Sequence, residues 1–100
     1  MVDGKYKIWV DTALGPTPGT IDLHTEGDKV IADINAPVVG KQRTEVQLEG
    51  ENAFNSEGVF KLLLFGKIEY KLHGEVEGES LRVDIITNKG DIHLKGTRES

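Results

Sequence analysis

Three histidines, His24, His73 and His93, are the side chains of this sequence best suited to coordinate a metal ion or to activate a nucleophile. Each falls on the polar phase of an alternating apolar and polar segment, so we expect all three to point into solvent. His24 and His73 occupy equivalent positions in two similar halves of the sequence, which places them on different sides of the fold. Because the ligands of one metal must converge, the histidines predict no metal site.

Carboxylates are the most abundant reactive groups, with 17 aspartates and glutamates against 12 lysines and arginines. Six of them flank glycines in predicted turns: Glu26, Asp28, Glu49, Glu51, Glu77 and Glu79. Exposed carboxylates keep ordinary pKa values and are poor general acids near neutrality. Their spacing also lacks the pattern of a calcium loop. We therefore expect a solvated acidic rim, with no cofactor.

Covalent catalysis has no recognisable motif in this sequence. The absence of cysteine excludes thiolate catalysis, disulfides and cysteine-based zinc sites. None of the three serines (Ser56, Ser80 and Ser100) lies in a Gly-x-Ser-x-Gly elbow. The glycines are spaced as turns and fit no phosphate loop. We predict no catalytic residue.

Tyr6 and Tyr70 are the reactive side chains that fall on the inward phase. A buried tyrosine hydroxyl requires a hydrogen-bonding partner, and a polar group of a ligand could be that partner. Thr12, Thr25 and Thr44 are candidate polar neighbours. Two alternatives stay open: both tyrosines are amphipathic core residues at the ends of the fold, or one of them is the general acid of an enzyme that acts inside the fold on a small hydrophobic substrate.

Two alternating series of glycine turns divide the chain into segments of about 12 residues, the spacing of short antiparallel strands. The first series recurs at intervals of 25, 26 and 24 residues, and the second contains the acidic turns: Gly15, Gly40, Gly66 and Gly90, and Gly27, Gly50 and Gly78. Between the turns the residues alternate apolar and polar. The pattern predicts eight strands near residues 5–12, 18–26, 29–36, 41–49, 53–64, 67–77, 80–87 and 91–98.

The predicted fold is a single all-β domain over residues 1–100. Eight consecutive antiparallel strands with one apolar face are most simply closed into an up-and-down barrel, which leaves no sheet edge. A two-sheet β-sandwich is the alternative, because closure depends on pairing of the first strand with the last. The alternation places Tyr6 and Leu48 inside and Trp9 and Ile31 outside.

The turns and strand ends carry a resemblance. Thr-Ala-Leu-Gly at 12–15, Gly-Lys-Ile-Glu-Tyr at 66–70, Val-Glu-Gly-Glu-Ser-Leu at 76–81 and Leu-Lys-Gly-Thr-Arg at 94–98 resemble a family of small, calycin-like bacterial β-barrel domains. Turns in that family read Thr-Pro-Met-Gly or Thr-Pro-Leu-Gly, and its domains end in Gly-Thr-Arg. The resemblance implies the barrel fold and supplies no catalytic residues. The sequence departs from it at Ala-Pro-Val-Val-Gly, Leu-Leu-Leu-Phe-Gly and Thr-Asn-Lys-Gly.

Three turns at the end opposite the acidic rim are apolar, whereas hairpin tips are normally polar. They would line the mouth of an apolar pocket, dock on a partner, or plug the barrel. Our leading hypothesis is a non-catalytic module that binds a small apolar ligand or a protein partner through this end. The predicted rim consists of Leu14, Val38, Val39, Leu64 and Phe65, with Tyr6 and Tyr70 as polar contacts.

Five apolar residues fall on the outward phase: Trp9, Ile31, Val59, Leu63 and Ile86. An exposed tryptophan together with aliphatic residues on the same outer surface suggests a self-association patch. A homodimer through the Trp9 face and a monomer are both left open. A purely structural or assembly domain is the remaining alternative to a binding module or an enzyme.

The composition of the chain argues against nucleic acid and membranes as binding partners. The net charge of −5 argues against nucleic acid, whose binding requires lysine and arginine. There is no polybasic segment for anionic lipid, and no apolar run approaches the roughly 18 residues of a membrane span. The segment Met1-Val-Asp-Gly-Lys lacks the apolar stretch of a secretory signal. We expect a cytoplasmic protein without nucleic-acid or membrane partners.

Overall fold

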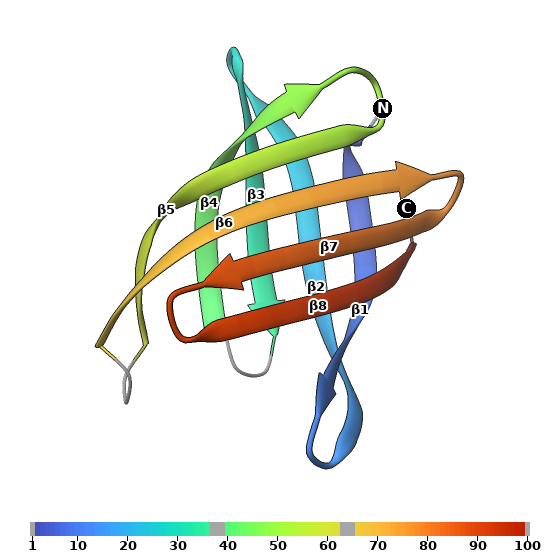
Figure 1. The fold of residues 1–100 in the computed structure, drawn as a ribbon. Helices are drawn as coiled ribbons and strands as arrows, with labels where there is room; N and C mark the ends of the chain where they lie inside the picture. Colours follow the sequence, from blue (N-terminus) through green and yellow to red (C-terminus); the bar gives the residue numbers. More distant parts are fainter. Residues whose placement is uncertain (1, 37–39, 63–65, 100) are drawn as a thin grey trace.

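The computed structural model describes residues 2–36, 40–62 and 66–99, and these form eight strands in chain order (Figure 1). Their bounds are β1 Gly4–Thr12, β2 Gly15–Glu26, β3 Lys29–Ala36, β4 Gly40–Glu49, β5 Ala53–Leu62, β6 Gly66–Glu77, β7 Ser80–Thr87 and β8 Gly90–Arg98. In the described ranges there is no helix of the length and apolarity that a membrane crossing requires.

The sheet closes on itself, as the sequence predicted. Every strand is antiparallel to its neighbours, and β1 pairs with β8 from Tyr6↔Arg98 to Val10↔Leu94. Because this ladder closes the strands into one continuous sheet, the alternative of a two-sheet β-sandwich is wrong. All seven predicted turn glycines have positive φ values, a backbone conformation that glycine adopts without steric cost. The turn positions are therefore confirmed.

One strand begins three residues earlier than predicted. β2 starts at Gly15, because Pro16 and Pro18 join the ladder with β1 opposite Asp11 and Trp9. Within the described residues, pairing of β2 with β3 begins only at Thr20. Proline cannot donate to a ladder and is tolerated in a strand that has a free side. The two prolines therefore lengthen the hairpin and do not interrupt it.

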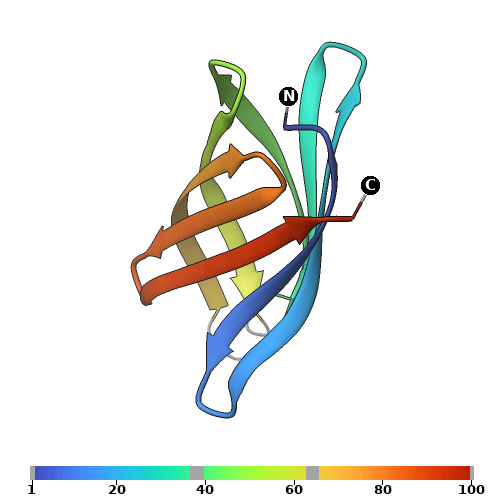
Figure 2. The ribbon, with the colours of Figure 1, turned by 90° about the vertical axis from the view of Figure 1, so that its right-hand side faces the viewer.

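The barrel is flattened into two layers whose strands cross steeply (Figures 1 and 2). The layer β1–β4 lies behind β5–β8 in Figure 1, and the overall extents are 34 × 27 × 17 Å. Inward side chains from both layers pack into one apolar cluster. Its buried members are Val2, Tyr6, Ile8, Val10, Ile21, Leu23, Ala32, Ile34, Ala36, Val46, Phe54, Leu72, Val76, Leu81, Val83, Ile85 and Leu94.

Among the residues whose burial is described, the alternation mispredicts Leu48 and Ile31. Leu48, expected inside, is 51% exposed, because it lies two residues before the Gly50 turn, at the end of the barrel. Ile31, expected in solvent, is only 9% exposed. Its cross-strand neighbours on the outer face are His24 and Glu45, whose larger side chains flank it.

Candidate functional site

The wall of the barrel is interrupted between β4 and β5. These strands pair only at Gln47↔Asn55, Leu48↔Phe54 and Glu49↔Ala53, next to their connecting turn. β5 instead pairs with β6 over its whole length, from Ala53 to Leu62. Beyond the third pair the two ribbons diverge toward the opposite end of the barrel (Figure 1). We call the space between residues 43–46 of β4 and 56–61 of β5 the β4–β5 opening.

Three hydroxyl groups meet where this opening begins. Thr44 Oγ1 lies 2.8 Å from Ser56 Oγ and 2.7 Å from Tyr70 Oη. The Ser56 hydroxyl also donates to the Glu45 carbonyl oxygen at 3.0 Å. Ser56 is 8% exposed, and the Thr44 and Tyr70 side chains are half-buried. β4, β5 and β6 thus contribute one hydroxyl each to a partly accessible polar cluster, the hydroxyl cluster.

A glycine fixes the position of the Tyr70 ring. Tyr70 is the cross-strand partner of Gly58. A Cβ atom on Gly58 would lie 3.4 Å from the Tyr70 hydroxyl oxygen and 3.5 Å from Cε1. The ring therefore lies against the bare backbone of β5, which directs its hydroxyl toward Thr44 and Ser56.

Tyr6 and Tyr70 belong to different sites. The Tyr6 hydroxyl donates to the Val2 carbonyl oxygen at 2.6 Å and accepts from Arg98 Nη2 at 2.7 Å. The Arg98 guanidinium carbon lies 5.3 Å from the centre of the Tyr6 ring. Tyr6 is 1% exposed and belongs to the β1–β8 closure. Of the two predicted polar contacts, only Tyr70 borders the β4–β5 opening.

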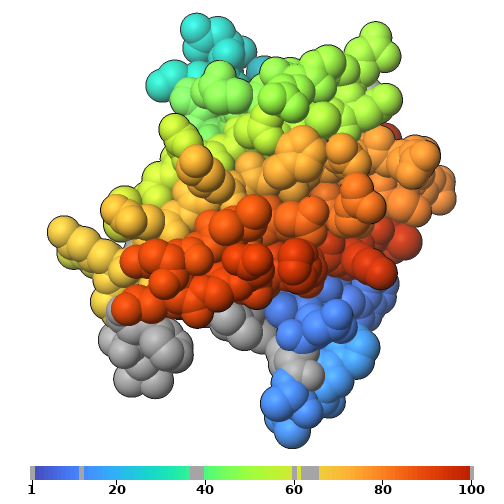
Figure 3. Space-filling model, viewed as in Figure 1, coloured from blue at the N-terminus to red at the C-terminus, as the bar shows by residue number. Residues whose placement is uncertain are grey.

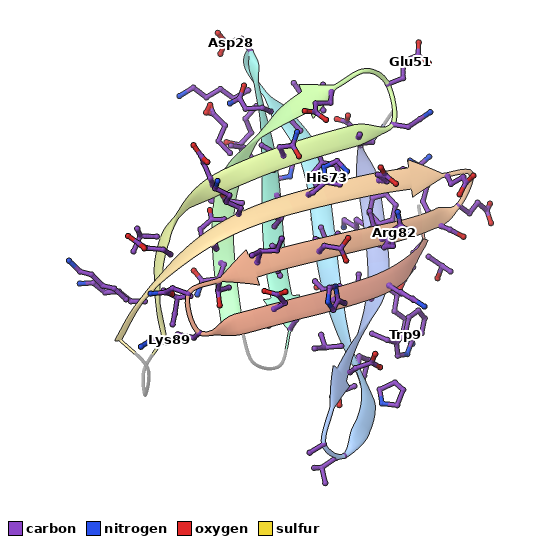
Figure 4. All side chains as sticks on the ribbon, viewed as in Figure 1. Trp9, Asp28, Glu51, His73, Arg82 and Lys89 are labelled. Carbon is purple, nitrogen blue, oxygen red and sulfur yellow. The ribbon has the colours of Figure 1, made fainter. Side chains whose placement is uncertain are left out.

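Of the five residues of the predicted apolar rim, only Leu14 lies within the described part of the chain. Leu14, in the β1–β2 turn, is 98% exposed, and its hairpin extends beyond the rest of the described surface at that end (Figures 1 and 3). Val38, Val39, Leu64 and Phe65 lie outside the described residues. The acidic turns lie at the opposite end, where Figure 4 shows Asp28 and Glu51.

The first half of the barrel carries a charged cluster on its outer face. His24 Nε2 lies 2.7 Å from Glu26 Oε2, and Arg43 contacts the same carboxylate. Hydrogen bonds from His24 and Arg43 lower the pKa of Glu26. The hydrogen bond to Glu26 raises the pKa of His24 against a smaller opposing effect of burial. The expectation of ordinary carboxylate pKa values is therefore wrong for Glu26, because His24 and Arg43 both hydrogen-bond to its carboxylate.

The second half repeats this arrangement with different neighbours. His73 Nε2 lies 3.2 Å from Glu75 Oε1, and Arg82 Nη2 donates to Glu75 Oε2 at 2.9 Å. The hydrogen bond from His73 lowers the pKa of Glu75, and the charge of Arg82 adds to this effect. His73 and Arg82 lie on the front layer in Figure 4. Across the described residues, no three metal-ligating side chains are grouped so that they could hold a metal ion.

Within the described residues, the exposed members of the predicted outward apolar set lie on three strands. Trp9 is 36% exposed on β1, with Pro18 and Lys95 as cross-strand neighbours. Val59 on β5 and Ile86 on β7 are each 56% exposed and line one shallow outer groove. The fifth residue of this set, Leu63, lies outside the described residues. Trp9 and the Val59–Ile86 groove are thus separate features of the surface.

Sequence reasoning identified Tyr70 and Thr44 but missed Ser56. Ser56 is two residues after the buried Phe54, so it shares the inward phase of β5, and alternation alone could have placed it inside. The β4–β5 opening also has a signal in the sequence, because its inward positions are polar residues or glycine where other strands place aliphatic residues: Gln42, Thr44, Ser56 and Gly58.

The comparisons support the fold and no family. No protein-family model matches this chain, and no curated protein matches it. Among solved structures, the chain is similar to a redesigned β-barrel, with a TM-score of 0.64 and 10% sequence identity. The match covers 99% of this chain and 92% of that chain. Likeness at this identity shows a shared fold, the eight-stranded antiparallel barrel.

Proposed function

We propose that this barrel is a non-catalytic binding module that takes a small apolar molecule carrying one hydrogen-bonding group. The ligand enters at the β4–β5 opening, and its polar group replaces one of the contacts within the hydroxyl cluster. The observation that carries the proposal is the convergence of Thr44, Ser56 and Tyr70 at a place where the described wall of the barrel is not closed by a ladder.

The chemistry of the cluster suits binding. Its hydroxyls bond one another and a backbone carbonyl oxygen, so they offer neutral donors and acceptors. A hydroxyl becomes a nucleophile when an adjacent base activates it, and the cluster pairs hydroxyl with hydroxyl. Apolar pockets with a few well-placed polar groups are the usual form of small-molecule sites.

Buried apolar residues lie on the strands that flank β4 and β5. Ile34 and Ile68, 5% and 2% exposed, come from the strands next to β4 and β5 on either side of the opening. Ile92 and Tyr70 are half-buried against the same core. A ligand at the opening would therefore exchange water for aliphatic contacts, which is the main source of affinity for apolar molecules.

A calycin-like relationship belongs to the same proposal. Eight consecutive antiparallel strands closed into one barrel support it, as do the turn motifs quoted above. Small barrels of eight strands either fill their interior with side chains or hold one small ligand. In this protein the core cluster fills the middle, so the proposed ligand occupies the side of the barrel.

Matched ligands test the proposal. 2-Naphthol and naphthalene differ by one hydroxyl group, and both can be followed by fluorescence. We expect 2-naphthol to bind more tightly, by about five- to tenfold for one hydrogen bond. Tyr70→Phe, which keeps the ring, should remove this preference.

Tyr6→Phe is the control variant, because it removes a hydroxyl at the closing ladder and should leave the preference intact. If neither ligand binds, or if Tyr70→Phe retains the full preference for 2-naphthol, the proposed site is wrong.

A further inference from the structure

We propose that the β4–β5 opening also accepts an extended peptide, which binds as an added β-strand through the backbone of the barrel wall. This inference goes beyond the small-molecule site, because it uses main-chain groups of β4 and β5 and not the hydroxyls inside. Its starting point is the three-pair ladder that leaves both strands with one-sided pairing over the rest of their length.

The direction of the backbone groups follows from one contact. Ser56 donates its hydroxyl to the Glu45 carbonyl oxygen at 3.0 Å, so that carbonyl faces β5. In a strand the N–H and C=O of one residue face the same neighbour, and successive residues alternate. Arg43 on β4 therefore also directs its backbone groups into the opening.

The same alternation fixes the facing residues of β5. Gln47 lies two residues after Glu45, so its backbone groups also face β5. Its cross-strand partner Asn55 therefore directs its own backbone groups toward β4. Alternation along β5 then assigns Glu57, Val59 and Lys61 to the opening.

These backbone groups have a ladder on one side only. Within the described residues, Glu57, Val59 and Lys61 are paired with Lys71, Glu69 and Lys67 of β6 and with no residue of β4. By the alternation, their N–H groups point away from β6. A row of unpaired N–H and C=O groups is the template on which another strand adds.

The geometry favours a free peptide over a second copy of this chain. β4 and β5 are antiparallel and both lack a partner at the opening, so the best occupant presents two free edges. An extended peptide does so, running parallel to one strand and antiparallel to the other. In a second copy, β4 and β5 each have only one free edge at the opening, so neither could pair with both sides of it at once.

The flanking side chains define the peptide chemistry. On the outer face an added strand would lie between Arg43 and Glu45 on one side and Glu57 and Val59 on the other, a mixed set of charges that suits neutral polar residues. On the inner face it would meet Thr44 and the Tyr70 ring, which lies against Gly58, so a small apolar residue such as valine suits this side. Such a strand would also cover the hydroxyl cluster from outside.

The probe is a capped heptapeptide of alternating threonine and valine, added to the ¹⁵N-labelled full chain and followed by amide hydrogen exchange. We expect the amides of Glu57, Val59 and Lys61 to exchange at least about tenfold more slowly with peptide, because each gains a hydrogen bond. The Gly58 amide, which faces β6, should be unchanged. The same peptide N-methylated at every second residue is the matched control and should give no protection.

Val59→Pro tests the opening from the protein side. This substitution removes one N–H group that faces the β4–β5 opening and leaves the ladder with β6 in place, as proline at a free strand edge can. It should therefore abolish the slowing of amide exchange by the peptide. Val59→Ala keeps the N–H and should retain it. Circular dichroism and thermal melting establish that both variants are folded.

Three results would overturn the inference: no protection by the peptide, equal protection by the N-methylated peptide, or unchanged peptide binding by folded Val59→Pro. If a higher protein concentration without peptide slows the exchange of the same amides, a second copy of the chain occupies the opening instead. Tyr70→Phe separates the two proposals, because it should weaken 2-naphthol binding and leave peptide binding unchanged.

Discussion

The Phe54 ring occupies the space that a side chain on Gly74 would fill. The two residues are cross-strand partners on β5 and β6, and a Cβ atom on Gly74 would lie 2.1 Å from Phe54 Cζ. Phe54 is 1% exposed, so its ring has little room to move. One aromatic ring and one glycine thus fit together as a unit of the core, on the same two strands that place Tyr70 against Gly58.

Alanine at these two glycines should have unequal effects. Gly74→Ala forces the buried Phe54 ring to shift and should lower the free energy of unfolding by about 1–3 kcal/mol. In Gly58→Ala the new methyl group lies at an ordinary contact distance from Tyr70, and alanine also restricts the unfolded chain. The free energy of unfolding should therefore fall by less than about 1 kcal/mol. Urea denaturation of both variants measures the difference, and equal losses would contradict the observed packing.

The two tyrosine hydroxyls should differ in their contribution to stability. Tyr6→Phe leaves the carbonyl of the buried Val2 without its donor, which should cost about 1–2 kcal/mol. In Tyr70→Phe the remaining hydroxyls of Thr44 and Ser56 still bond each other, so the loss should be smaller. Thermal unfolding of the two variants under one condition provides the comparison. A larger loss for Tyr70→Phe would show that the hydroxyl cluster supports the fold more than the closing ladder does.

The His24–Glu26 pair should make stability depend on pH. The pKa of His24 is raised above 6.5 in the folded state, so its contribution is complete below 6.5 and is lost as the pH rises through the raised value. The pKa of Glu26 is lowered below 4.5, so its contribution is present above 4.5 and is lost as the pH falls through the lowered value. The pair stabilises the fold most between these limits.

Glu26→Gln tests this window. The difference in melting temperature between wild type and Glu26→Gln should be largest between the two limits and should shrink on both sides. It should also shrink at high salt, because the pair is exposed and screened. Glu51→Gln, a turn carboxylate outside this cluster, should show no such window. A flat difference across pH would mean that the pair does not form in solution.

A homodimer through the Trp9 face stays a prediction. Trp9 has a partly exposed ring with Lys7 Nζ 5.5 Å from its centre. If this face associates, sedimentation should give a dimer that Trp9→Lys converts to a monomer, while Val59→Lys on the separate groove leaves it intact. A monomer at every concentration would remove the prediction.

The sequence predicted the strands better than it predicted the site, and the reason is physical. Alternation and positive-φ glycines are local properties, so strand positions and turns could be assigned from short windows. Closure depends on Tyr6 meeting Arg98, and no local pattern contains that pairing. The β4–β5 opening depends on how the two layers cross, so Thr44 and Tyr70 could be assigned inward while their contact with Ser56 could not be predicted. Leu48 shows the limit of alternation at a barrel end.

The closing ladder has a consequence for the order of folding. Tyr6 and Arg98 are 92 positions apart in the chain, and the Glu99 amide donates to the Lys5 carbonyl oxygen at 2.7 Å. Contacts of such long sequence separation slow folding, because the loop between them must close first. Joining β8 to β1 by a short linker and opening the chain at Gly50 would turn this remote contact into a neighbouring hairpin. The rearranged chain should keep the same barrel and reach it faster.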